Sequence, residues 1–366
     1  MIGQEQLDDA IEHGRAQPLA FGDLEYARLL EPIAGYPRGS VVLPGGAVLP
    51  GYPSIARIQS LEAGLPRTFT GAFWAEEKID GFNVRILCRD GEVYAFSRGG
   101  FVCAFSTDRA TEFFDPAVFE AEPDLVLCAE IAGPDTPYLE GSPPQIREDV
   151  ELFVFDMMRL GQTEFLPQAE KFALLERHHL PSAPLHGRFA PDDLEALGAL
   201  IRQLDDAGVE GLVLKTEVGN HRAKYVTGSS CIADIRVCAE QLLDLSPEYF
   251  THRLTRLAVF LAEHPPRDTA AVERELGQAL LAGLGDAVDK SRQVGRVSHR
   301  YRCRFRQREN VRRFREHMET TGGRHVRFVE GTPRREGDYW VLEFERLFDH
   351  MTGTLSSALA GDRQFD

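Results

Sequence analysis

One lysine stands among carboxylates in Glu76-Glu77-Lys78-Ile79-Asp80-Gly81-Phe82-Asn83-Val84-Arg85-Ile86, and the glycine of this segment precedes an apolar run that predicts a strand. A lysine is protonated at neutral pH, so it becomes a nucleophile only when burial or neighbouring cations lower its pKa. Later segments supply charged candidates for such a site, namely Arg98, Glu130, Glu210, Lys215 and Lys224. Each of these residues is a weak signal by itself. Lys78 alone would also be a weak signal, because a loop lysine beside acids is usually an exposed, solvated residue. Their joint occurrence makes Lys78 a candidate covalent nucleophile.

The composition is that of a globular protein with room for two domains. The chain has 366 residues, of which 43% are hydrophobic and 27% are charged. No apolar run of membrane-spanning length and no cleavable leader is visible, so we expect no membrane association and a cytoplasmic location. The six cysteines are scattered without zinc-site spacing and are predicted to be reduced core residues.

The formal net charge of -16 argues against indiscriminate wrapping of nucleic acid. One basic segment stands out between Lys290 and Arg315, where eleven lysines and arginines face the single acid Glu309. Two interpretations stay open for this segment. It forms a solvated face balanced by acidic neighbours, or it contacts RNA or a partner subunit.

The middle of the chain predicts an α+β unit of mainly antiparallel strands. Asp90-Gly91 separates two alternating runs and predicts a hairpin turn, because glycine accepts the positive φ of a tight turn. The predicted strands are 84–88, 93–96, 125–131, 152–155 and 209–215. The predicted helices are 168–178 and the segment from Pro191 to Gly208.

The two ends of the chain have different patterns. Residues 1–35 predict helix, with an amphipathic pattern around Leu24, Tyr26, Leu29 and Leu30, and residues 45–53 predict turns around a short strand. Beyond about Cys238 the pattern is helical. The expected elements there are helices around 254–261, 272–284 and 309–320, followed by a strand pair at 327–330 and 339–344. We therefore expect an N-terminal module (1–60), a central domain (61–238) and a mainly helical C-terminal domain (239–366).

Six segments in order resemble the motif set of the covalent nucleotidyltransferase superfamily, which contains the polynucleotide ligases and capping enzymes. They are Lys78-Ile79-Asp80-Gly81, Ser97-Arg98-Gly99-Gly100, Ala129-Glu130-Ile131-Ala132-Gly133-Pro134, Phe153-Val154-Phe155-Asp156, Glu210-Gly211-Leu212-Val213-Leu214-Lys215 and Lys224-Tyr225-Val226. An asparagine five residues past the lysine, as at Asn83, resembles the pattern of ATP-dependent RNA ligases. DNA ligases usually have arginine at that position. The length and the helical last third resemble the archaeal-type homodimeric RNA ligase group.

This resemblance implies an α+β nucleotidyltransferase (ATP-grasp-like ligase) domain of antiparallel sheets with flanking helices, plus a mainly helical C-terminal domain. It also implies an enzyme that joins or circularises RNA. Lys78 would attack the α-phosphorus of ATP to form lysyl-AMP, with Mg²⁺ or Mn²⁺ offsetting phosphate charge. AMP would then pass to a 5′-phosphate, and a 3′-hydroxyl would displace it. A homodimer is the implied assembly.

The resemblance implies a role for each motif residue. Glu77, Ile79 and Gly81 would adjoin the nucleotide, Glu130 would hold the ribose, Phe155 would stack on adenine, and Arg98 would contact phosphate or sugar. Asn83 would act at the RNA end, Glu210 would support the metal, and Lys215 and Lys224 would bind the α-phosphate and lower the pKa of Lys78. For Phe155 the alternative is a core aromatic paired with Phe153, which shares its strand face.

One spacing does not fit a straight strand. Glu210 and Lys215 are five residues apart and would face opposite sides of a sheet. Either the strand bends at Gly211 or only one of the two reaches the nucleotide.

Three other functions compete with an RNA ligase. A DNA ligase or a capping nucleotidyltransferase would usually carry a compact β-barrel after the last motif, where this chain predicts helices. A catalytically idle RNA-binding relative would not need to keep the lysine and its charged partners.

Overall fold

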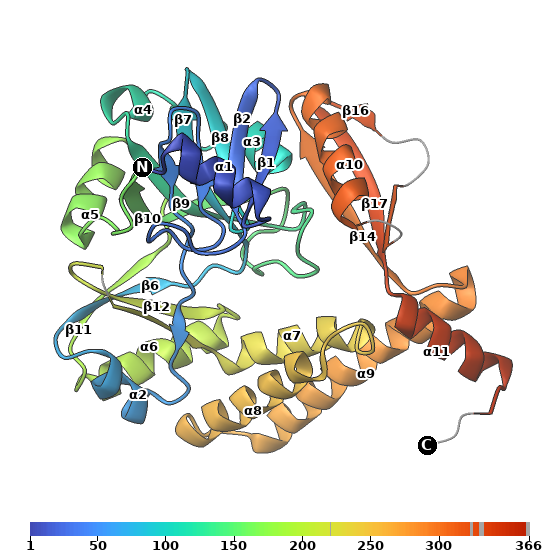
Figure 1. The fold of residues 1–366 in the computed structure, drawn as a ribbon. Helices are drawn as coiled ribbons and strands as arrows, with labels where there is room; N and C mark the ends of the chain where they lie inside the picture. Colours follow the sequence, from blue (N-terminus) through green and yellow to red (C-terminus); the bar gives the residue numbers. More distant parts are fainter. Residues whose placement is uncertain (220, 323–324, 329–332, 364–366) are drawn as a thin grey trace.

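Two mainly antiparallel sheets lie one above the other at the centre of the protein, which confirms the α+β class (Figure 1). The structure is a computed structural model and describes residues 1–219, 221–322, 325–328 and 333–363. Among the described helices none is long and apolar enough to cross a membrane.

The upper sheet has the strand order β10-β9-β7-β8, and all its neighbours are antiparallel. Its strands are β7 (Phe82–Arg89), β8 (Glu92–Ser97), β9 (Leu125–Ala132) and β10 (Glu151–Arg159). The predicted hairpin at Asp90-Gly91 is confirmed. Side chains of β9 alternate between two cores: Leu125 and Leu127 face one, and Val126 and Cys128 face the other. This sheet is therefore buried on both faces.

The lower sheet has the order β11-β6-β12-β13-β5, with only the β13–β5 pair parallel. Its strands are β5 (Ala56–Arg57), β6 (Phe73–Glu77), β11 (Leu185–Phe189), β12 (Gly211–Thr216) and β13 (Arg222–Val226). Phe73, Ala75, Leu212 and Leu214 share a hydrophobic core on one face. Alternation leaves the other face to polar residues, and that face turns toward the upper sheet.

Five helices flank the sheets. They are α2 (Leu61–Thr68), α3 (Ala104–Ala110), α4 (Val118–Ala121), α5 (Gln168–Arg177) and α6 (Leu194–Asp206). The predictions for 168–178 and for the segment ending at Gly208 are confirmed by α5 and α6. Leu197, Ile201 and Leu204 of α6 pack in the core beneath the lower sheet.

The prediction of helix over residues 1–35 is wrong beyond its first third. Only α1 (Gln4–Glu12) is helical, and β1 (Ala16–Phe21), β2 (Leu24–Leu29), β3 (Val41–Val42) and β4 (Val48–Leu49) form a four-stranded sheet. Leu24 and Tyr26 are both buried and follow the two-residue period of a strand, which their spacing to Leu29 disguised as a helical stripe. The turns and short strand predicted for 45–53 are confirmed.

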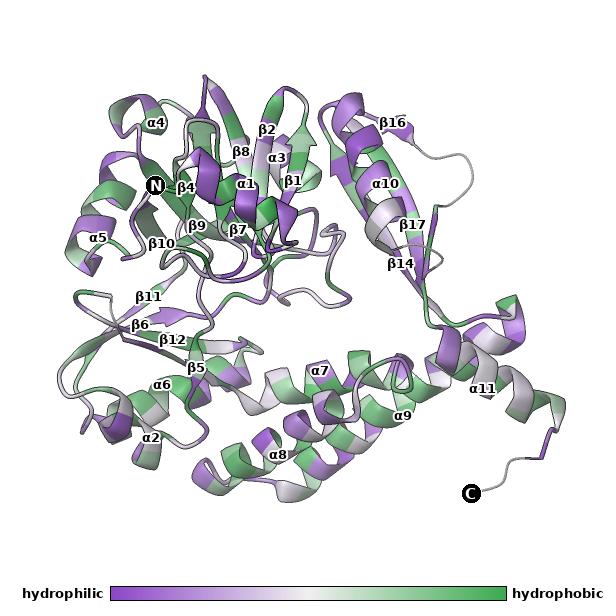
Figure 2. Cartoon of the chain, in the orientation of Figure 1, coloured by the Kyte–Doolittle hydropathy of each residue, from purple (hydrophilic) through white to green (hydrophobic). Residues whose placement is uncertain are grey.

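Three helices follow the last motif: α7 (Gly228–Glu240), α8 (Pro247–Glu263) and α9 (Thr269–Val294). They pack on one another through Ile232, Ile235, Leu257 and Ala279. Apolar residues alternate with polar ones along these helices (Figure 2). The helical character predicted here is confirmed, although α7 begins earlier than the sequence suggested.

The chain ends in a small module that packs back against the central domain. It contains β14 (Ser298–Phe305), α10 (Arg308–Gly322), β15 (Val326–Phe328), β16 (Arg334–Glu336), β17 (Tyr339–Leu347) and α11 (Asp349–Ala360). The predicted strand pair is present as β15 and β17, except that residues 329–330 lie outside the described part. Phe305 and Phe314 share the core that lines β9.

Most of the basic segment is balanced by carboxylates, as the first of its two interpretations requires. Arg302 and Arg304 reach Asp135 at 2.9 and 2.8 Å, and Arg306 reaches Glu112 at 2.8 Å. These acids belong to the central domain, so the two arginines of β14 and Arg306, which follows it, hold the C-terminal module onto that domain.

Candidate active site

Lys78 stands where the chain crosses from the lower sheet to the upper one. It directly follows β6, and the next strand, β7, belongs to the other sheet. A cavity lies at this crossing. Its lining includes nine residues predicted from the sequence: Glu77, Lys78, Ile79, Asn83, Arg98, Glu130, Phe155, Lys215 and Lys224. Segments far apart in sequence therefore meet here.

The floor of the cavity is the polar face of the lower sheet. Cα pairing sets Glu76 opposite Val213 and Val213 opposite Lys224, and Lys224 in turn pairs with Arg57 on β5. Paired residues project to the same face of a sheet, so these four side chains form a row across four strands. Lys215 stands two residues past Val213 and shares this face.

Gly81 brings the crossing segment against β9. A Cβ atom at this position would lie 2.5 Å from Glu130 Cγ and 2.8 Å from the Ile131 carbonyl oxygen. Only glycine permits this approach. Asn83 then pairs with Glu130 across β7 and β9, with Asn83 Nδ2 3.5 Å from Glu130 Oε2. Gly81 thus positions the sheet crossing and does not itself line the cavity.

The ammonium of Lys78 donates a hydrogen bond to the carboxylate of Glu210. Its backbone N–H also donates to the Gly211 carbonyl at 2.8 Å, which extends the β6–β12 pairing to the lysine. Burial lowers the pKa of Lys78, but Glu210, Glu130 and Asp80 outweigh it and the pKa is raised. The expectation of a lowered pKa is therefore wrong for this arrangement, because carboxylates are closer to Lys78 than cations are.

The carboxyl groups around Lys78 also have shifted pKa values. Burial, together with the charge of Glu210, raises the pKa of Asp80 to about 7. Burial raises that of Glu130 to about 8, although the charge of Lys78 opposes the shift. Carboxylate oxygens crowded in this way suit a hard divalent cation, which usually completes its shell with water and substrate phosphate. Within the described residues no preformed cage of three or more such side chains exists.

The raised pKa of Glu130 predicts a pH-dependent stability. The folded protein holds a proton on Glu130 that the unfolded chain releases near pH 4.5, so the free energy of unfolding falls as pH rises toward 8. The slope is at most about 1.4 kcal/mol per pH unit for one group. Urea unfolding at pH 5, 6, 7 and 8 measures it, and Glu130→Gln should flatten the slope. The exposed Glu164→Gln is the control; an equal slope in both variants would refute the assignment.

The backbone at Gly211 explains how Glu210 and Lys215, which are five residues apart, can both lie near Lys78 and the cavity. Its φ is 146°, and a Cβ there would lie 2.1 Å from the Tyr225 carbonyl oxygen. Strand β12 starts at this glycine, so Glu210 precedes the regular alternation and reaches Lys78 while Lys215 still lines the cavity. The bend is thus the alternative that the structure supports.

Lys215 lies deeper than its predicted role requires. It is fully buried, and its ammonium lies 2.7 Å from Glu76 and 3.4 Å from Asp156. It also donates to the Phe155 carbonyl at 2.6 Å. A second buried lysine, Lys171, pairs with the other oxygen of Glu76. The cation of Lys215 is therefore committed to a buried ion network under the cavity floor.

Phe155 is aimed into the cavity by a bulge in β10. The register to β9 shifts between Val154 and Asp156, so Phe155 is the extra residue and leaves the regular alternation. Its ring meets Tyr52 edge-on at 5.4 Å. Tyr52 in turn donates to Asp156 at 2.9 Å. Phe155 is thus oriented by its neighbours and is available for stacking.

Lys224 and Arg98 present the free positive charge of the cavity. Arg98 donates to Ser54 Oγ at 2.9 Å, and within the described residues Lys224 has no carboxylate partner. Burial lowers the pKa of Lys224, and the charges of Arg57, Lys78 and Arg98 lower it further. Both residues are therefore placed to meet an anion.

Several residues of the site carried no usable signal in the sequence. Glu76 and Asp156 belong to the quoted segments, but nothing in the sequence indicated that they bind buried lysines, and Lys171 and Arg57 lie in no motif. Their importance comes from strand pairing and from burial of charge, which one sequence does not display. One indirect indication was present in the sequence, namely that the acid Asp156 directly follows Phe155 at the end of the predicted strand 152–155.

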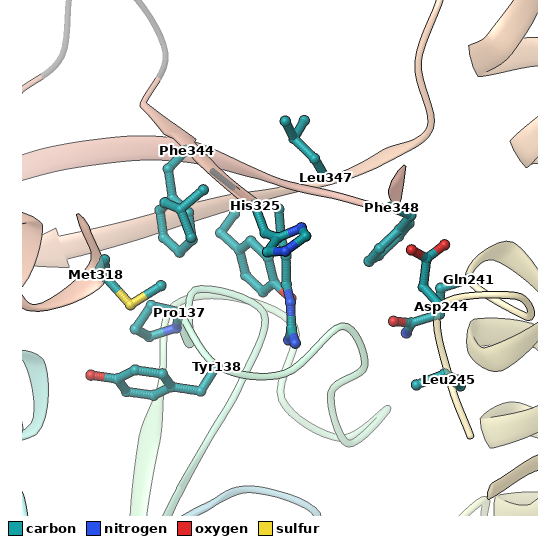
Figure 3. A pocket seen from close by; sticks show the side chains of 13 residues that line it. Pro137, Tyr138, Gln241, Asp244, Leu245, Met318, His325, Phe344, Leu347 and Phe348 are labelled. Carbon is teal, nitrogen blue, oxygen red and sulfur yellow. The ribbon is translucent and has the colours of Figure 1, made fainter. Parts of the chain in front are cut away.

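A second cavity lies between the C-terminal module and the helices (Figure 3). Its described lining residues include Phe344, Phe348, Met318, Tyr138 and Arg346. It contains no residue of the six motifs. The concentration of charge and motif residues therefore favours the cavity at Lys78 as the active site.

Comparison with known proteins gives the family. The model of the family described as RNA ligase matches residues 71–226, and that of the ligase Pab1020 C-terminal region matches 237–362. The solved structure of a putative ATP-dependent DNA ligase from Aquifex aeolicus is 37% identical, covers 99% of this chain and 100% of its own, and superposes with a TM-score of 0.92. The chain belongs to the RNA ligase family.

Two further proteins are similar to this RNA ligase over most of its length. A solved archaeal ATP-dependent RNA ligase is 26% identical over 99% of this chain and 97% of its own, with a TM-score of 0.88. An uncharacterized protein of Methanocaldococcus jannaschii is 27% identical over 278 residues, which are 74% of this chain and 70% of that protein. The likeness to the solved relatives thus extends through the helices and the C-terminal module.

Proposed function

We propose that this RNA ligase uses ATP to join 5′-phosphate and 3′-hydroxyl RNA ends through a lysyl-AMP intermediate. The observation that carries the proposal is the position of Lys78, which lines a cavity together with Lys224 and Arg98 and is hydrogen-bonded to Glu210. In the first step Lys78 Nζ bonds to the α-phosphorus of ATP and the bond to pyrophosphate breaks. Glu210 is hydrogen-bonded to Nζ and accepts its proton.

The other cavity residues have roles that follow from their positions. Phe155 would stack on the adenine, with Glu77 and Ile79 beside the base and Glu130 at the ribose. Lys224 would bind the α-phosphate, and Arg98 would contact phosphate or sugar. For Lys215 we now propose a positioning role through Glu76 and the Phe155 carbonyl. Glu210 would support Mg²⁺ or Mn²⁺, whose charge would stabilise the phosphates.

Incubation with α-labelled ATP tests the first step. We expect a covalent, acid-labile label on the protein, as a phosphoramidate gives, and none with α-labelled GTP. A label from GTP in place of ATP would point to a capping enzyme, and no label from either would leave an idle RNA-binding relative.

RNA rather than DNA as the substrate is supported by the family model and by Asn83. The two solved relatives are described differently: the Aquifex protein as a putative ATP-dependent DNA ligase, and the archaeal protein as an ATP-dependent RNA ligase. Asn83 Oδ1 is buried without a hydrogen-bond partner in the described structure. A buried acceptor without a partner costs free energy unless a ligand satisfies it. We propose that the donor is on the RNA end, such as its ribose hydroxyl.

Asn83→Ala should separate adenylylation from sealing. We expect lysyl-AMP formation within about twofold of the unchanged protein, and RNA sealing slowed about 10- to 100-fold, as for loss of a hydrogen bond to a charged or reacting group. Single-turnover assays with adenylylated enzyme and 5′-phosphorylated RNA measure this. Asn83→Gln keeps the amide but moves it one methylene further from the backbone, so it tests whether the position of the amide matters. Equal losses in both steps would place Asn83 at ATP instead.

We propose that the protein is a homodimer through its helices. Leu281 and Val294 of α9 are 70% and 54% exposed, and such apolar surface favours a partner. Light scattering should give twice the chain mass, and Leu281→Glu should shift the mass toward one chain. Leu185→Glu, at a leucine of β11 that is 45% exposed, is the matched control. A single-chain mass for the unchanged protein would contradict the proposal.

The division into units at 1–60, 61–238 and 239–366 and the cytoplasmic location also stay proposals. The boundary at 238 falls inside α7, which packs against α8 and α9. A fragment should therefore end before Gly228 to keep this helix whole.

A further inference from the structure

Arg57 extends the cavity floor by one strand beyond the motifs. Its strand, β5, is the edge of the lower sheet and pairs in parallel with β13, which sets Arg57 beside Lys224. Because Lys224 lines the cavity, its Cα partner projects from the same face at the rim. Arg57 comes from the segment before the first motif, so no part of the motif series includes it.

The charges around Arg57 are set for an anion. In the described chain its guanidinium has no hydrogen bond or ion pair, although it is half-buried. Burial lowers its pKa, while the more distant carboxylates of Glu210 and Asp234 support its charge. Lys224 and Arg98 are also without carboxylate partners among the described residues. Asp234 is already held by Arg253 at 2.7 Å. Arg57 on β5 and Arg98 after the end of β8 both lie close enough to Lys224 on β13 to lower its pKa, and among the described residues none of the three forms an ion pair with a carboxylate.

We infer that Arg57, Lys224 and Arg98 form a phosphate site that holds the pyrophosphate part of ATP. This inference rests on the proposed function. In an in-line displacement the leaving group departs opposite to Lys78 Nζ. With the α-phosphate between Lys78 and Lys224, the next side chain along the row is Arg57, and its planar fork binds phosphate oxygens in pairs. The site stabilises pyrophosphate as the bond from its oxygen to the α-phosphorus breaks and its negative charge grows.

The reverse reaction tests pyrophosphate binding at this site separately from the binding of the rest of ATP. Pyrophosphate oxygen attacks the phosphorus of lysyl-AMP, the phosphorus–nitrogen bond breaks, ATP leaves, and the lysine nitrogen regains a proton. With purified adenylylated protein we expect Arg57→Gln to raise the pyrophosphate concentration for half-maximal ATP release about 10- to 100-fold. Arg57→Lys should recover part of the loss. Arg67→Gln removes an exposed arginine of the neighbouring helix α2 and is the control.

Two further measurements separate the possible outcomes. If Arg57→Gln slows only AMP transfer to 5′-phosphorylated RNA, Arg57 serves the RNA 5′-phosphate and the inference of a pyrophosphate site is wrong. If Arg57→Gln matches Arg67→Gln in both reactions, the inference is wrong. Inorganic pyrophosphate alone should raise the melting temperature of the ligand-free protein, and Arg57→Gln should lose this rise while melting normally without it. No rise in the unchanged protein would overturn the site, whether or not the protein forms lysyl-AMP.

Discussion

Lys78→Ala should reduce AMP labelling of the protein to background, a loss of about 10³-fold or more, because the proposed phosphoramidate forms on the side-chain nitrogen of Lys78. Lys78→Arg should fail equally. Arginine keeps the positive charge and can still pair with Glu210, but it stays protonated and cannot attack phosphorus. Both variants should fold, since Lys78 lies at the cavity and not in a hydrophobic core.

Lys290→Ala is the matched control for this test. The protein has another lysine–glutamate pair there, between Lys290 and Glu240, and it lies outside the cavity. We expect Lys290→Ala to label normally. Labelling retained by Lys78→Ala and lost in another lysine variant would mean that the nucleophile was wrongly chosen. Peptide mapping of the AMP adduct gives an independent identification.

Glu76→Ala should have the largest effect on stability. Glu76 is 2% exposed, and its two oxygens hold the buried ammonium groups of Lys171 and Lys215. Removing the carboxylate leaves two lysines of like charge together in the interior. We expect the free energy of unfolding to fall by about 3–5 kcal/mol. Urea unfolding measures this, and Glu316→Gln, at an exposed pair with Arg312, should cost less than about 1 kcal/mol.

The stability of Glu76→Gln should rise with pH. Burial and the neighbouring charge of Lys215 already lower the pKa of Lys171 to about 8, below its usual 10.5. Between these values the unfolded chain binds more protons than the folded one, so the free energy of unfolding rises with pH. Loss of the Glu76 charge should extend this rise below pH 8. If the variant gains no more stability than the unchanged protein between pH 7 and 9, the two lysines are not held as charged neighbours.

The central fold was predictable because alternation and turn chemistry agree there. Asp90-Gly91 fixed one hairpin, and the periodic helix before Gly208 led directly into β12. The N-terminal sheet was missed because its strands are short and Leu24, Tyr26 and Leu29 match a helical spacing as well as a strand. The early start of α7 was missed because the motif strand runs directly into it.

The motif residues of the site were predictable as a group, whereas their electrostatics were not. Sequence order indicated that Lys78, Glu130 and Lys224 belong to one site, and the structure brings them to one cavity. The direction of the Lys78 pKa shift depends on which charges are nearest, and that follows from the bend at Gly211 and the close approach at Gly81. Arg57 depends on one parallel strand pair, for which the sequence offers no pattern.

The sealing of RNA ends tests the central proposal most directly. A 5′-phosphorylated single-stranded RNA should be circularised or joined by the unchanged protein with ATP and a divalent metal, through an adenylylated RNA end that can be trapped. Nicked duplex DNA of the same sequence should be sealed far more slowly. Sealing of nicked DNA together with no action on RNA would contradict the account, even if lysyl-AMP forms.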